Sequence, residues 1–184
     1  MPQSIFNVLS GLQEGSLSAR INQRQLASGI SADAIRKGAL VRMDATGKMV
    51  LAELKSGANY LSGRDIEVVY DDLYGNAGPI GENQVIMNTG TVATPVNTAL
   101  NLLPGISVTT LSGSFEAEQD WIDEAGGVIT SGSFLVAKGG KLALAVDADI
   151  AAGAHFAKCT GIKAAANCWI SGKPQGKIVR YSYL

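Results

Sequence analysis

The chain has 184 residues, of which 46% are hydrophobic and only 17% are charged, and its formal net charge is −1. A chain of this length and hydrophobicity can bury a core, which excludes a disordered tail. The basic residues are scattered, which predicts no direct binding to nucleic acid, and no apolar run reaches the roughly 18 residues of a membrane span. The low charge favours a surface that partners cover, although Ser, Thr, Asn and Gly could supply the polarity instead.

The first 30 residues differ from the rest of the chain. Apolar residues from Ile5 to Leu12 have the spacing of one face of a helix, which Ser4 could cap. So short a helix is unstable alone, so we expect it to dock on this subunit or on a neighbour. The polar run over 16–30 indicates an extended arm. We predict an N-terminal arm over 1–30, and its candidate partner contacts are Ile5, Phe6, Val8, Leu9 and Leu12.

Residues 31–70 have the pattern of strands. A strand over 35–41 leads to the turn residues Asp44 to Gly47, and a second apolar segment follows over 48–54. Aspartate and glycine are typical of tight turns, so this stretch predicts a β-hairpin. Residues 64–70 predict another strand.

The middle of the chain is rich in Gly and Pro. We predict a loop-rich insertion over about 71–124, with a strand near 84–87 and another over 106–111. An acidic stretch over 116–124 surrounds Trp121, which we expect to anchor the core or an interface.

The last third returns to short strands separated by glycine turns. Segments 128–137 and 141–146 flank Lys138 to Gly140, and we expect three more strands over 155–160, 166–170 and 177–183. Residues 31–184 therefore predict a single, mainly β domain, a small β-barrel or β-sandwich built from glycine-turn hairpins.

One pattern occurs twice in the chain. Residues 35–52 and 129–145 align with a one-residue gap and share Ile-x-x-Gly, an apolar strand, a Gly-Lys turn and a closing Leu-Ala. The glycines of the two turns can supply the positive φ that a tight hairpin needs. Duplication and chance similarity of two hairpins both explain the match.

The sequence offers little for catalysis. The single histidine, His155, fits a half-buried strand position, and no Gly-x-Ser-x-Gly elbow is present. The segment from Gly172 to Lys177 is one residue short of a phosphate-binding loop and lacks its hydroxyl residue. We therefore predict no enzyme, no cofactor and no metal, although Asp147 and Asp149 leave weak Ca²⁺ binding open.

The two cysteines, Cys159 and Cys168, do not have the spacing of a zinc motif. The N-terminus lacks the features of a signal peptide, so we expect synthesis in a cytoplasm, with both thiols reduced and buried. A disulfide between neighbouring strands remains the alternative.

The arm together with the two hairpins resembles the small decoration, or cement, proteins of tailed-bacteriophage heads. The resemblance rests on Lys37 to Val41 followed by Asp44 to Lys48, and more weakly on 129–162; the middle segment 71–124 departs from it. It implies a virion structural protein on the capsid surface. It also implies binding to the major capsid protein, a dimer or trimer, and no catalytic residues.

Two other functions remain open. A tail or neck protein would form rings of six or twelve copies. A glycan hydrolase would use carboxylates such as Asp120 or Glu124.

Overall fold

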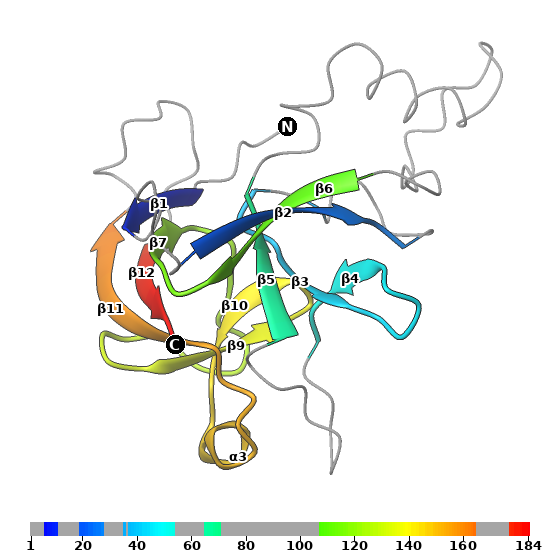
Figure 1. Cartoon of the computed structure of the whole chain (residues 1–184). Helices are drawn as coiled ribbons and strands as arrows, with labels where there is room; N and C mark the ends of the chain where they lie inside the picture. Colours follow the sequence, from blue (N-terminus) through cyan, green and yellow to red (C-terminus); the bar gives the residue numbers. More distant parts are fainter. Residues whose placement is uncertain are drawn as a thin grey trace, which may run out of the picture.

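The computed structural model describes residues 6–10, 19–27, 35, 37–53, 65–70, 107–164 and 177–184. These residues are mainly β: they form two sheets and one short helix, α3 (Asp147–Ala151) (Figure 1). The prediction of a mainly β fold is confirmed at this level.

The larger sheet has seven strands. Their order is β1 (Phe6–Ser10), β7 (Glu116–Gln119), β12 (Lys177–Tyr183), β11 (Ala157–Ala164), β9 (Phe134–Lys138), β10 (Lys141–Leu144) and β8 (Ile122–Asp123). All neighbours are antiparallel except β10 and β8, which run parallel.

The smaller sheet has five strands, all antiparallel to their neighbours. Their order is β2 (Ala19–Gln25), β6 (Ser107–Gly113), β5 (Ile66–Val69), β3 (Leu40–Met43) and β4 (Met49–Leu51). The described strands of neither sheet pair into a closed ring.

Both predicted hairpins are present. In the β3–β4 turn the Asp44 carboxylate accepts hydrogen bonds from the backbone N–H groups of Thr46 (2.8 Å) and Lys48 (3.0 Å), and Gly47 has a φ of +80°. In the β9–β10 turn Gly139 and Gly140 have φ values of +57° and +75°. Aspartate and glycine therefore form these turns for the local reasons that the sequence indicates.

The two sheets contain the same five-stranded unit. We define the first repeat as β2, β3, β4, β5 and β6, and the second repeat as β7, β9, β10, β11 and β12. In each repeat the first strand pairs with the fifth, the fifth with the fourth, the fourth with the second and the second with the third. β1 and β8 lie outside this unit, at the two ends of the larger sheet.

The strand registers of the two repeats also match. Val41 pairs with Leu51 in the first repeat, as Leu135 pairs with Leu144 in the second. The matched glycines, Gly38 and Gly132, have φ values of +86° and +89°. The N–H of Gly38 donates to the Val69 carbonyl at 2.8 Å, and that of Gly132 donates to the Cys159 carbonyl at the same distance.

Equivalent positions are buried in both repeats. The pairs are Ile35 and Ile129, Val41 and Leu135, Met49 and Leu142, Val69 and Cys159, and Val108 and Val179. The match between the hairpins thus extends to a whole unit.

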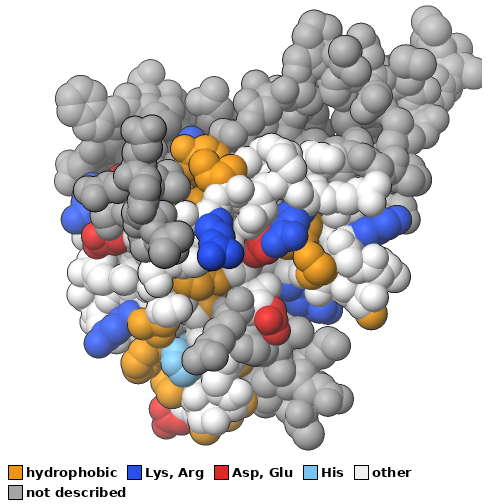
Figure 2. All heavy atoms as spheres, viewed as in Figure 1, with side chains coloured by type: hydrophobic (Ala, Val, Ile, Leu, Met, Phe, Trp, Pro, Cys, Tyr) orange, Lys and Arg blue, Asp and Glu red, His pale blue; other side chains and the backbone are white. Residues whose placement is uncertain are grey.

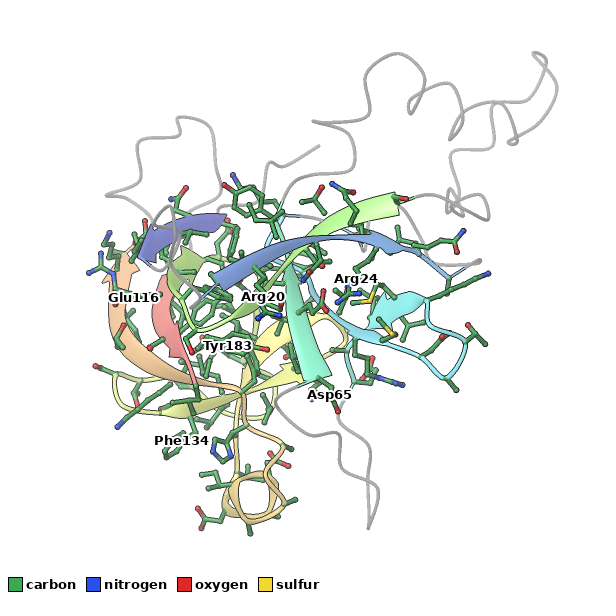
Figure 3. The ribbon with its side chains drawn as sticks, in the orientation of Figure 1. Arg20, Arg24, Asp65, Glu116, Phe134 and Tyr183 are labelled. Carbon is green, nitrogen blue, oxygen red and sulfur yellow. The ribbon has the colours of Figure 1, made fainter. Side chains whose placement is uncertain are left out.

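One hydrophobic core joins the two sheets. It contains Leu40, Val68 and Leu111 from the first repeat together with Leu135 and Tyr181 from the second. The Tyr183 hydroxyl donates to the Ile66 carbonyl across the two sheets; Figure 3 labels Tyr183.

A backbone contact reinforces the junction between the repeats. The Leu40 N–H donates to the Gly140 carbonyl at 2.8 Å, and the Gly140 N–H donates to the Ala52 carbonyl at 2.9 Å. The tip of the second hairpin therefore lies against the base of the first.

The predicted helix near the N-terminus is wrong over the described residues, because 6–10 form strand β1. β1 pairs with β7, which satisfies its backbone hydrogen bonds, and this pairing buries Phe6 and part of Val8. The apolar spacing fits both a helical face and an alternating strand, and the contact with β7 decides between them.

The expected extended run contains β2, which pairs with β6. The division into an arm and a domain at residue 30 stays a prediction.

The other predicted strands agree in part with the strands of the structure. Strands expected over 64–70, 106–111, 155–160 and 177–183 correspond to β5, β6, β11 and β12, whereas the strand expected from 128 begins at Phe134. We did not predict β7, β8 or α3. The expected strands over 84–87 and 166–170 lie outside the described residues, as does most of the segment from Gly172 to Lys177.

Candidate interaction surface

The predicted contact residues of the N-terminal segment lie in different environments. Phe6 is 1% exposed and belongs to the shared core, and Val8 is half-buried against that core. Leu9 points outward and is 41% exposed. Ile5 and Leu12 lie outside the described residues. Leu9 is therefore the described member of this set that is available to a partner.

Trp121 lies near the junction between the repeats. Its ring is half-buried and packs against the core cluster of the first repeat, which includes Met49 and Val69. The Lys141 ammonium nitrogen lies 4.7 Å from the centre of the ring, within the range of a cation–π contact. Trp121 thus contributes to contacts within the chain.

Glu118 is the centre of a polar cluster on the larger sheet. Its carboxylate accepts hydrogen bonds from Lys163 (2.7 Å) and Asn7 (3.2 Å), and the Arg180 guanidinium lies 3.6 Å away. Burial raises the pKa of Glu118, but the hydrogen bonds and positive charges outweigh it and hold the pKa below its usual value. The cluster connects β1, β7, β11 and β12.

Several carboxylates considered for chemistry have structural contacts. Glu124 accepts a hydrogen bond from Lys177 and another from the Ile129 backbone N–H. The Asp149 carboxylate accepts the Val146 backbone N–H at 2.9 Å, at the start of α3. Within the described residues no group of three or more His, Cys, Asp or Glu side chains could hold a metal ion.

His155 and Cys159 lie close together in the sequence but differ in exposure. The half-buried His155 ring and the Phe134 ring form a T-shaped pair, with ring centres 4.9 Å apart. Cys159 is a buried free thiol, and burial raises its pKa, which disfavours the reactive thiolate. Cys168 lies outside the described residues.

In each repeat, side chains from four neighbouring strands form a row across the sheet. The polarity of this row differs between the two repeats. In the first repeat the row is Ile21, Leu111, Val68 and Leu40, one residue from each of four paired strands. The equivalent row of the second repeat is Glu116, Ser182, Lys158 and Phe134. The first row is apolar because three of its members lie in the shared core. The second row is largely polar; Figure 3 labels Glu116 and Phe134.

Exposed apolar side chains are spread over the molecule. In the described part of the chain the large ones are Leu9, Ile21, Met43, Val128, Val146, Ile162 and Leu184. On the face shown in Figure 2, hydrophobic, basic and acidic side chains are interspersed. Sequence reasoning missed Ile21, because its significance depends on its neighbours across β6 and β5.

Comparison with protein-family models, with curated proteins and with solved structures finds no match for this chain. None of the helices in the described part of the chain is long and apolar enough to cross a membrane.

Proposed function

We propose that this chain is a virion structural protein that decorates a bacteriophage capsid and stabilises it by binding across capsid subunits. The observation that carries the proposal is the glycine-turn hairpin, whose sequence resembles that of head decoration proteins and which occurs in both repeats. A scaffold of two sheets with one shared core is rigid, as a protein that clamps its neighbours requires.

Residues 1–30 supply the capsid contact in this proposal. The exposed Leu9 lies on β1, and β1 is held by its pairing with β7 and by the bond from Asn7 to Glu118. An apolar side chain on a fixed strand can fill a pocket on a partner at a low cost in conformational entropy.

The proposal includes the packing of the two sheets as a β-sandwich. Core residues of both sheets lie in one cluster, the arrangement expected when two sheets pack face to face.

Cosedimentation with expanded phage heads that lack their decoration protein tests the proposal. We expect the protein to pellet with the heads, and Leu9→Asp to weaken binding at least tenfold because it places a charge in an apolar contact. Val146→Asp is the matched control, because Val146 is 51% exposed at the start of α3, which lies at the opposite end of the molecule from β1 (Figure 1).

Two results would count against the proposal. Protein that stays in the supernatant at every concentration would exclude capsid binding. Six- or twelve-fold rings that bind tails but not heads would favour the tail or neck function.

A further inference from the structure

Within the described residues the outer edge of β2 is open from Ala19 to Gln25, and the chain next pairs with β4 through a bridge between Leu26 and Met49. β2 pairs with β6 in an unbroken register from Ala19 opposite Gly113 to Gln25 opposite Ser107, and no other described strand pairs with β2. An edge strand exposes backbone N–H and C=O groups that can pair with a further strand. β2 contains no proline or bulge that would prevent such pairing.

The second repeat shows that the equivalent strand edge pairs with a further strand. Its equivalent strand is β7, and β1 covers the outer side of β7 as an antiparallel neighbour. Because the two repeats share strand order and register, the outer edge of β2 has the geometry to accept an antiparallel strand too.

Ile21 provides a second, independent observation. It continues the row in which Leu40, Val68 and Leu111 are 0% exposed, yet Ile21 itself is 55% exposed. A large apolar side chain at the open end of a buried row is typical of a surface that another strand covers. The equivalent residue of the second repeat is the polar Glu116.

We propose that β2 pairs with β2 of a second copy of this chain, antiparallel across a twofold axis, so that the two five-stranded sheets become one. The described strands that end the two sheets are β1, β8, β2 and β4, and among them β2 is the one whose equivalent, β7, carries an added antiparallel strand. Antiparallel pairing of identical strands satisfies twofold symmetry.

Charge favours one of two neighbouring registers for this pairing, in which Arg24 also keeps its ion pair with Glu67 of its own chain at 2.8 Å. If the axis passes beside Ile21, the two Ile21 side chains face each other and Arg20 lies opposite the partner's Asn22. If the axis passes beside Asn22, Arg20 lies opposite the partner's Arg24, and like charges directly opposite destabilise a sheet. Figure 3 labels Arg20 and Arg24 on β2. The structure therefore favours the register centred on Ile21.

Sedimentation velocity of the full chain over a range of concentrations tests the dimer. Pairing of one strand from each copy buries little area, so we expect a reversible, concentration-dependent dimer. Ile21→Lys should weaken dimerisation at least tenfold. Met43→Lys is the matched control, because Met43 is 43% exposed on β3 of the same sheet, and it should leave dimerisation unchanged.

Cysteine cross-linking tests the register. Under mild oxidation Ile21→Cys should form a disulfide-linked dimer, whereas Gln23→Cys should not, because the two positions 23 lie far apart in this register. The unchanged chain, with its own Cys159 and Cys168, gives the background. Equal cross-linking of the two variants would overturn the register.

Two further outcomes would overturn the proposal as a whole. One is a chain that stays monomeric up to its solubility limit. The other is protection from hydrogen exchange, in the dilute monomer, of the β2 amides that point away from β6, because the outer edge is then filled within the chain. Neither outcome bears on capsid binding through Leu9.

Discussion

At the scale of single residues, the glycine at the tip of the second hairpin does more than form a turn. Gly140 joins the two repeats through backbone hydrogen bonds to Leu40 and Ala52. A Cβ at this position would lie 2.7 Å from the Leu51 Cδ2 atom, so Leu51 would have to move. The equivalent Gly47 has nothing within 4 Å.

These two glycines give a matched test of the junction. Gly47→Ala should lower the free energy of unfolding by about 1–2 kcal/mol, the cost of a side chain at positive φ. Gly140→Ala carries the same cost and adds an overpacking cost of about 1–3 kcal/mol. Urea unfolding of the two variants measures the difference. Equal losses would show that Gly140 is only a turn residue.

Glu118 predicts how stability depends on pH. Its pKa is lowered in the folded chain, so its contribution is present above the unfolded pKa of about 4.3 and is lost as the pH falls through the lower folded value. Glu118→Gln should therefore lower stability by about 1–2 kcal/mol at pH 7 and by less near pH 3. Denaturant midpoints at both pH values measure this. A variant with the same loss at both pH values would contradict the role given to the charge.

At the scale of elements, β1 depends on one buried side chain. Phe6 is 1% exposed and belongs to the core that joins the sheets. Phe6→Ala should cost about 3–5 kcal/mol in unfolding free energy and should increase hydrogen exchange in β1. Leu9→Ala, on the exposed side of the same strand, should change stability by no more than about 0.5 kcal/mol. Comparable losses in both variants would mean that β1 does not pack as described.

Elements that their own residues determine could be predicted from the sequence. Elements that depend on contacts with residues far along the chain could not. The β3–β4 turn follows from Asp44 and Gly47 themselves. β1 was predicted as a helix because its pairing partner, β7, is more than 100 residues away. β7 was missed because Glu118 and Gln119 are polar, and their burial depends on polar partners that are distant in the sequence, such as Asn7, Lys163 and Tyr181.

At the scale of the whole molecule, the architecture is one unit used twice. The sequence pattern revealed only the hairpin part of this repeat, because strands such as β5 and β11 share register and burial but not side chains. Val69 and Cys159 illustrate this difference: they occupy equivalent positions with equivalent backbone bonds. The surface at β2 could not be predicted from the sequence either. Ile21 continues the row of Leu111 and Val68 only when the strands are paired in the folded sheet.

The two repeats have different side chains where their surroundings differ. Val68 and Leu111 are covered by the second repeat, whereas the equivalent Lys158 and Ser182 face outward. A polar outer face of this kind ends a stack of repeats and keeps it from extending. Further assembly is therefore expected at β2 and at the exposed face of β1 rather than at this end.

The proposed function requires that the protein binds the surface of a capsid lattice. An electron cryomicroscopy map of expanded phage heads incubated with the protein tests it most directly. If the protein decorates capsids, the map should contain density for the two-sheet domain on the outer surface of the shell, bridging neighbouring capsid subunits, with β1 at the contact. Heads without added density, or density confined to the neck or tail, would contradict it.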